Sequence, residues 1–187
     1  MKNIKDLKIK IFADGADLES IRELNSIPYI GGFTTNPTLM KKAGVLDYKK
    51  FAIEVLNIVK KKPVSFEIFA DDIKEMEEQA LEIASWGSNA NVKIPITNTK
   101  GESTVQLIKK LSDLKVVCNI TAIFTLEQLN KVINVLNSST PAILSVFAGR
   151  IADSGINPFD IMKDSVRLAK KKPKSSILWA STREILN

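Results

Sequence analysis

The stretch Ala90-Asn91-Val92-Lys93-Ile94-Pro95-Ile96 has the composition of a short buried strand with a charged residue at its centre. Val and Ile favour the pleated conformation, and four of the seven residues are apolar. Because side chains alternate along a strand, Lys93 points to the face opposite Val92 and Ile94. Cover on both faces would partly desolvate the ammonium group and favour the neutral amine, which attacks carbonyls and forms Schiff bases. A lone lysine in a strand more often simply reaches water. The polar residues at the ends of the neighbouring strands therefore decide whether Lys93 is a solvated lysine or a Schiff-base nucleophile.

Strand-like and helix-like patterns alternate along the whole chain. No domain break, low-complexity tract or fixed-period repeat interrupts them, so residues 1–187 are expected to form a single domain with a sizeable core. Pro37 fits the first turn of a helix, and residues 149–153 are expected to form a loop. The expected strands are 7–13, 29–33, 64–69, 90–96, 115–120, 142–147 and 176–180, and the longer helices are 18–25, 48–61, 73–85, 103–113, 125–137, 158–171 and one that starts at 181.

This alternation predicts a parallel sheet whose strands are joined by right-handed crossovers. Such a sheet is either open and doubly wound or closed into a (β/α) barrel. A barrel builds its site from the carboxyl ends of many strands, whereas an open sheet concentrates its site at one switch point. Polar residues follow nearly every expected strand, and the chain has no GxGxxG or P-loop pattern. We therefore expect an α/β fold that forms a (β/α) barrel, with seven strands evident before the chain ends.

The composition excludes several kinds of chemistry. The chain has no histidine, which removes histidine bases, serine–histidine or cysteine–histidine nucleophile pairs, and histidine metal sites. Carboxylates, lysine, tyrosine or water must therefore carry any proton transfer. The single cysteine, Cys118, excludes an internal disulfide framework and is typical of a reducing cytoplasm.

Charge and hydropathy bear on the partners and the location. The net charge of +6 suits phosphate-bearing ligands, while no basic patch interleaved with aromatic residues is found, so no nucleic-acid partner is expected. No apolar run approaches the roughly 18 residues of a membrane span, and the N-terminus lacks the apolar core of a signal peptide. A cytoplasmic protein with no membrane contact is expected.

Polar residues stand at or just past the ends of the expected strands. Most of them have a structural explanation when taken singly, as turn formers, helix caps or surface residues. Glu67 is harder to explain in this way, because a carboxylate between Phe66 and Ile68 in a buried strand needs a partner, and Lys93 on the adjacent strand is the expected one. The residues at the strand ends are Asp14, Asn36, Glu67, Lys93, Asn119, Thr121, Ser145, Arg150, Ser181 and Arg183.

The motifs around these residues resemble those of the transaldolase family, of the short bacterial type. They run from residue 12 to residue 183 and are jointly specific, although each one alone is weak. The matching stretches are Phe12-Ala13-Asp14, Thr34-Thr35-Asn36-Pro37, Ser65-Phe66-Glu67-Ile68, Val92-Lys93-Ile94-Pro95, Asn119-Ile120-Thr121, Ser145-Val146-Phe147-Ala148-Gly149-Arg150 and Ala180-Ser181-Thr182-Arg183.

The resemblance implies an α/β fold of the (β/α)8 TIM-type barrel class and transfer of a three-carbon dihydroxyacetone unit in the pentose phosphate pathway. The donor would be sedoheptulose 7-phosphate or fructose 6-phosphate, and the acceptor an aldose phosphate. Lys93 would form the Schiff base with the ketose carbonyl, and Asp14 would take the C4 hydroxyl proton during cleavage. Glu67, with Thr121 and a water, would carry protons as the Schiff base forms and breaks.

The resemblance also assigns the binding residues and partners. No cofactor and no metal are expected, because the iminium itself is the electron sink, and the chain is expected to form a homo-oligomer. Phe147 would lie in the pocket beside the Schiff base. Asn36, Asn119 and Ser145 would hold donor hydroxyls and the carbinolamine, and Arg150, Ser181 and Arg183 would bind the terminal phosphate.

Two alternatives stay open. Fructose 6-phosphate aldolases share the barrel and the lysine, but they carry glutamine where Glu67 stands and tyrosine where Phe147 stands, so both residues favour transaldolase. The family ordinarily continues with an eighth strand and C-terminal helices, which this sequence lacks. The second alternative is therefore a truncated, non-catalytic phosphosugar-binding barrel.

Overall fold

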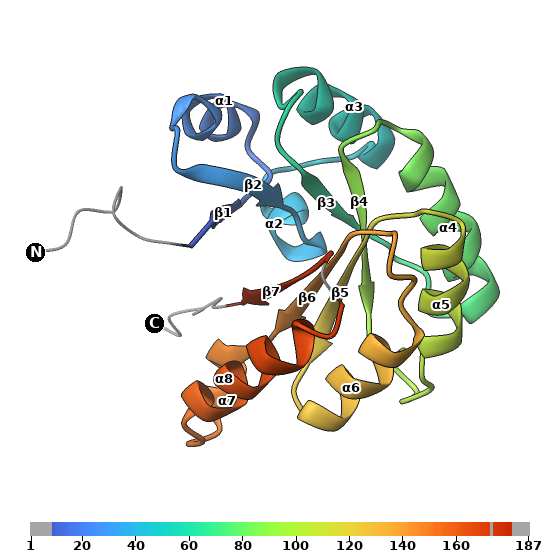
Figure 1. The fold of residues 1–187 in the computed structure, drawn as a ribbon. Helices are drawn as coiled ribbons and strands as arrows, with labels where there is room; N and C mark the ends of the chain where they lie inside the picture. Colours follow the sequence, from blue (N-terminus) through green and yellow to red (C-terminus); the bar gives the residue numbers. More distant parts are fainter. Residues whose placement is uncertain (1–8, 173, 181–187) are drawn as a thin grey trace, which may run out of the picture. The chain divides into compact units, whose positions relative to one another are not determined.

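The structure is a computed structural model that describes residues 9–172 and 174–180 (Figure 1). Strands and helices alternate along this part of the chain, and the strands take the order β1-β2-β3-β4-β5-β6-β7, the same as in the sequence. The strand pairs within each half of the chain are parallel. This repeating arrangement confirms the predicted (β/α)8 barrel class.

The chain divides into two compact units, which are described separately. The first comprises Met1–Phe69 and Glu82–Val92. Its described strands pair in parallel, with Asp14 opposite Thr34 and Thr34 opposite Ser65, and helices α1 and α3 pack together. Its elements are β1 (Ile11–Asp14), α1 (Leu18–Ser26), β2 (Ile30–Thr34), α2 (Pro37–Lys42), α3 (Tyr48–Ile58) and β3 (Val64–Glu67).

The second unit comprises Ala70–Leu81 and Lys93–Asn187. Strands β5, β6 and β7 pair in parallel in sequence order, and α6 packs against α5 and α8. Helix α4 (Ile73–Ser85) and strand β4 (Ala90–Pro95) contribute residues to both units. The other elements are α5 (Val105–Asp113), β5 (Cys118–Ile123), α6 (Leu126–Val135), β6 (Ala142–Val146), α7 (Ala148–Asp153), α8 (Pro158–Ala169) and β7 (Ser175–Trp179).

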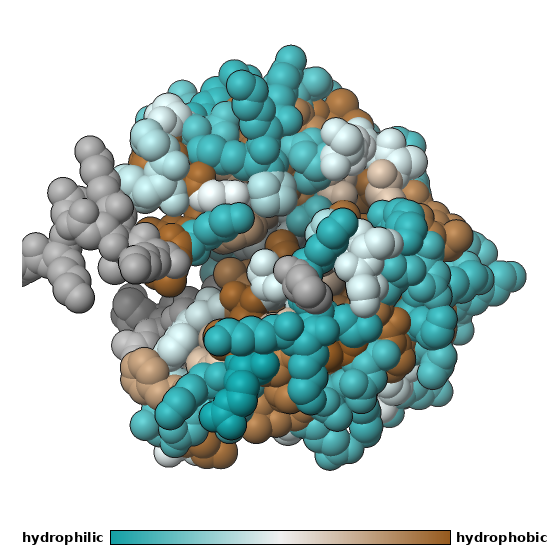
Figure 2. Space-filling model, viewed as in Figure 1, coloured by the Kyte–Doolittle hydropathy of each residue, from teal (hydrophilic) through white to brown (hydrophobic). Residues whose placement is uncertain are grey.

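Amphipathic helices explain how the apolar residues are covered. The buried faces of the helices carry residues such as Val55, Ile83, Ile108 and Ile133, at most 2% exposed. Hydrophilic side chains cover much of the face shown in Figure 2, and hydrophobic ones show in groups between them. Among the helices that the structure describes, none has both the length and the apolar composition needed to cross a bilayer.

Two of the expectations from the sequence were wrong. Residues 149–153 belong to helix α7 and not to a loop. The helix has only six residues, which is too few to show a helical period in the sequence, and Gly149 has a low helix propensity. Strand β5 begins at Cys118 and not at 115, because Lys115 turns the chain after α5 with a φ of 67°. Helix α2 begins at Pro37, as expected, and the helix expected from 181 lies outside the described residues.

Asn89 ties the turn before β4 to the end of α3. Its side-chain amide donates to the carbonyls of Val59 (2.6 Å) and Lys62 (2.9 Å). We predict that Asn89→Ala lowers the free energy of unfolding by about 1–3 kcal/mol, because two partly buried carbonyls lose their donor. Urea unfolding followed by circular dichroism would show a lower midpoint with the slope unchanged.

The exposed Asn57 of α3 is the matched control, and Asn57→Ala should change stability by less than about 0.5 kcal/mol. Equal midpoints for Asn89→Ala and the original protein would contradict this explanation.

Candidate active site

Asp14 ends β1 beside the start of α2. Its carboxylate accepts hydrogen bonds from Oγ1 of Thr34 (2.8 Å) and Nδ2 of Asn36 (3.2 Å). Asn36 is also the N-cap of α2, where its Oδ1 accepts from the backbone N–H of Leu39 (2.9 Å). Since both ends of the Asn36 amide are used, its orientation is fixed. The structure thus brings two of the predicted site residues, Asp14 and Asn36, into direct contact.

Glu67 is the last residue of β3 and is half-buried. Its backbone carbonyl accepts a hydrogen bond from the Tyr48 hydroxyl (2.8 Å), which reaches it from the first turn of α3. Burial, with a further contribution from the negative charge of Glu67, raises the pKa of Tyr48 far above its ordinary value. Tyr48 therefore stays protonated and remains a donor throughout the neutral range.

Tyr48 was missed in the sequence, where it stands between Asp47 and two lysines and shows no strand-end position. Its ring lies in an aromatic cluster of edge-to-face contacts. The centroid distances are 6.3 Å to Phe66, 4.7 Å to Phe69 and 5.3 Å to Trp86. The cluster fixes the tyrosine ring, and through its hydroxyl it holds the backbone at the end of β3.

Lys93 lies in β4 with the burial pattern that alternation predicts. It is half-buried, whereas its neighbours Val92 and Ile94 are fully buried. Glu67 and Lys93 belong to different units, and their predicted pairing stays a prediction.

Asn119 and Ser145 form a buried polar pair between β5 and β6. The Ser145 hydroxyl donates to Oδ1 of Asn119 at 2.6 Å. Asn119 lies opposite Ile143 in the parallel register, so it shares a face with Ser145, two residues farther along β6. The bond orients the Asn119 amide, with Oδ1 toward Ser145 and Nδ2 directed elsewhere. Two predicted site residues are thus fixed relative to one another inside the second unit.

Thr121 follows on the same strand and is only 2% exposed. Its hydroxyl has no hydrogen-bond partner within the part of the chain that the structure describes. A buried hydroxyl without a partner is unfavourable by about 1–3 kcal/mol, a cost that valine, with nearly the same shape, would avoid. Packing alone therefore does not explain a threonine at this position.

A β-bulge interrupts β5 beside Thr121. The register passes from Ile120 opposite Leu144 to Ile123 opposite Val146, so β5 takes three steps while β6 takes two. Ala122 absorbs the extra residue in the left-handed region, with a φ of 57°. This conformation is unfavourable for any residue with a Cβ, and such strained positions concentrate at functional sites.

Phe147 and Arg150 follow β6. Phe147 is the N-cap of α7 and is half-buried, and its ring packs edge-to-face on Phe124 with centroids 5.5 Å apart. Arg150 lies exposed on α7, with its guanidinium 3.9 Å from the carboxylate of Asp153. The remaining predicted residues, Ser181 and Arg183, lie outside the described residues.

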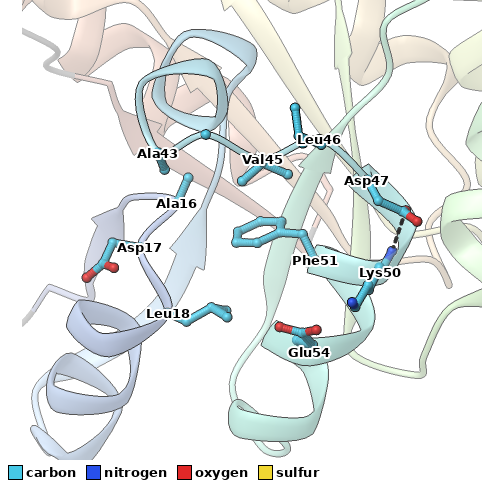
Figure 3. Close-up of a pocket in the computed structure, with 11 residues that line it drawn as sticks. Ala16, Asp17, Leu18, Ala43, Val45, Leu46, Asp47, Lys50, Phe51 and Glu54 are labelled. Atoms are coloured by element: carbon cyan, nitrogen blue, oxygen red, sulfur yellow. Dashed lines mark hydrogen bonds between the residues drawn. The ribbon is translucent and has the colours of Figure 1, made fainter.

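A pocket of about 480 Å³ lies in the first unit, between α1, α3 and the loop that joins α2 to α3 (Figure 3). It contains none of the predicted site residues, and three of its lining side chains are the carboxylates of Asp17, Asp47 and Glu54. Lys50 also lines the pocket, so three carboxylates outnumber one ammonium group, and the net negative charge makes it a poor site for an anionic sugar phosphate. A second pocket of about 340 Å³ in the same unit includes Asp14 in its lining, which places that carboxylate at an accessible surface.

Neither a metal cluster nor a reactive thiol is found in the described residues. No group of three or more carboxylate or cysteine side chains there is placed to hold a metal ion. Burial raises the pKa of the Cys118 thiol to about 12, so the thiol stays protonated and is a weak nucleophile.

Comparison with known proteins gives the family. The family model described as transaldolase/fructose-6-phosphate aldolase matches residues 11–187. A probable transaldolase of Dehalococcoides mccartyi is 34% identical over 180 residues, which cover 96% of this chain and 80% of the relative. A probable transaldolase of Streptococcus agalactiae is 35% identical over 83% of this chain and 68% of its own length, and one of Bacillus cereus is 33% identical over 94% and 77%. These matches confirm the resemblance seen in the sequence motifs, and the chain belongs to the transaldolase/fructose-6-phosphate aldolase family.

Proposed function

We propose that this chain is a transaldolase that moves a dihydroxyacetone unit from a ketose phosphate to an aldose phosphate through a Schiff base on Lys93. The observation that carries the proposal is the position of Lys93, half-buried between two fully buried neighbours in β4. A lysine amine adds to a ketone carbonyl and forms a Schiff base. Membership of the family, together with relatives described as probable transaldolases, supports the same chemistry.

In the first half-reaction, the Lys93 amine adds to the C2 carbonyl of the donor, and loss of water from the carbinolamine leaves an iminium. Asn119 and Ser145 are proposed to hold the oxygens of this intermediate. The Ser145 hydroxyl donates to Asn119 Oδ1, so the two side chains are held in a fixed relation to one another. A preoriented buried pair of this kind loses little entropy when the substrate binds.

Cleavage follows when a base takes the proton of the C4 hydroxyl. We assign this role to Asp14, whose carboxylate is held by Thr34 and Asn36. The C3–C4 bond breaks, its electrons enter the iminium to form an enamine on Lys93, and the shortened aldose phosphate leaves. The enamine then attacks the aldehyde of the acceptor, and reversal of the first steps releases the new ketose phosphate.

Proton transfer at the carbinolamine is assigned to Glu67, Thr121 and a water. The Thr121 hydroxyl has no protein partner in the described part of the chain and can take up such a water. The terminal phosphate is assigned to Arg150, with Ser181 and Arg183 completing its site. A planar, accessible guanidinium suits a phosphate group.

The substrate requirement tests the proposal. The chain should convert fructose 6-phosphate only when an aldose phosphate such as erythrose 4-phosphate is present, and it should release little dihydroxyacetone without an acceptor. A coupled assay of glyceraldehyde 3-phosphate release, with and without the acceptor, measures this directly. Equal cleavage in both conditions would identify an aldolase, the second candidate function. Substrate binding without cleavage would identify a phosphosugar-binding barrel.

Arg150→Ala tests the assignment of the phosphate site. Loss of charge-assisted hydrogen bonds worth about 1.5–3 kcal/mol should raise KM for phosphorylated donors by about 10- to 150-fold, with a much smaller effect on unphosphorylated ones. Arg167 is the matched control, since it is an exposed arginine on α8 that also pairs with an aspartate three residues away. Arg167→Ala should leave KM unchanged. Equal losses on phosphorylated and unphosphorylated donors would contradict the assignment.

A further inference from the structure

The bulge in β5 and the loop after it hold one aromatic residue, Phe124, in a fixed place. The Phe147 backbone N–H donates to the carbonyl of Ile123 (2.9 Å), which joins the carboxyl end of β5 to that of β6. The backbone N–H groups of Phe124 and Thr125 both donate to Oε1 of Gln128, at 2.9 and 3.2 Å. This is part of the capping box that starts α6. Phe124 is therefore anchored immediately beside Phe147.

Phe124 does not belong to the buried core. It is 40% exposed, although it follows a strand whose residues are nearly all buried. Its ring packs on Phe147 with an interplanar angle of 66° and a centroid distance of 5.5 Å, which is the edge-to-face geometry that aromatic quadrupoles favour. The ring is partly covered, and its edge-to-face contact with Phe147 fixes its orientation in a way that burial of an aliphatic side chain would not.

We propose that Phe124 is a positioning residue that holds the Phe147 ring over the reacting carbon and so sets how often the enamine is quenched before the acceptor arrives. The inference rests on the proposed function, because it assumes an enamine on Lys93 beside Phe147. Quenching adds a proton to the enamine carbon that was C3 of the donor and regenerates an iminium. Water then hydrolyses the C=N bond, which releases dihydroxyacetone and restores the Lys93 amine. A Phe147 ring held in place keeps water from that carbon.

Replacing the Phe124 ring should shift the balance between transfer and release. Phe124→Leu keeps an apolar side chain but removes the edge-to-face contact. It should increase acceptor-independent dihydroxyacetone release, relative to transfer, by about 2- to 13-fold, the factor that corresponds to the 0.5–1.5 kcal/mol contributed by such ring pairs. Phe124→Tyr keeps the ring and should leave this ratio within about 2-fold of the original protein.

Phe159 offers a matched control in the same unit. Its exposed ring also makes an edge-to-face contact, with Trp179 at 5.3 Å and 64°, but it lies on α8 and its ring partner is Trp179 and not Phe147. Phe159→Leu should leave the ratio of release to transfer unchanged. The inference is overturned if Phe124→Leu leaves the ratio unchanged, or if Phe159→Leu shifts it equally.

A second measurement decides the positioning role without turnover. In protein with labelled phenylalanine rings, Phe124→Leu should shift the ring proton resonances of Phe147 by removing the ring current of its neighbour, whereas Phe159→Leu should not. Unchanged Phe147 resonances in Phe124→Leu would overturn the inference even if the protein is an active transaldolase. Absence of transfer in the original protein would instead reject the proposed function, and the resonance shift would still test the contact.

Discussion

The two-residue period of a buried strand is the constraint on which the rest of this site depends. It leaves Lys93 half-buried while its neighbours on either side are fully buried. The same period, with the parallel register of β5 and β6, puts Asn119 and Ser145 on one face, close enough for a hydrogen bond of 2.6 Å. Polar groups can occupy such faces only if they are paired or serve a reaction, because an unpaired buried group is costly.

The polar residues at the strand ends are held by one another before any substrate binds. Asp14 is fixed by Thr34 and Asn36, and Asn36 is fixed in turn by capping α2. Tyr48 holds the backbone of Glu67 through a hydroxyl that stays protonated, because burial raises its pKa. Thr121 differs from these residues, since its buried hydroxyl has no partner in the described residues and it lies beside the strained Ala122. The first unit thus holds preoriented polar groups, and the second holds a position, Thr121 beside Ala122, where stability is sacrificed.

The sequence was sufficient for the fold class, because periodicity and motif spacing are local properties, but it placed Asn119 at the end of its strand, whereas Asn119 is the second residue of β5. It could not reveal the bulge in β5, since an extra residue in one strand is visible only against the register of its neighbour. Helix α7 was missed because six residues with an internal glycine give no helical period. Tyr48 and Phe124 were missed for a related reason: the importance of each comes from a contact distant in sequence, with Glu67 in one case and Phe147 in the other. The predicted pairing of Glu67 with Lys93, and the catalytic and binding roles assigned to all the strand-end residues, stay predictions.

The central claim is that Lys93 forms a covalent intermediate with the donor ketose, and chemical trapping tests it most directly. Borohydride added to the protein with fructose 6-phosphate should reduce the iminium to a stable secondary amine, which peptide mass mapping should locate on Lys93. Lys93→Arg should abolish the adduct, and Lys115→Arg, which alters an exposed lysine before β5, should not. An adduct on another lysine, or its absence in protein that converts the donor, would contradict the account.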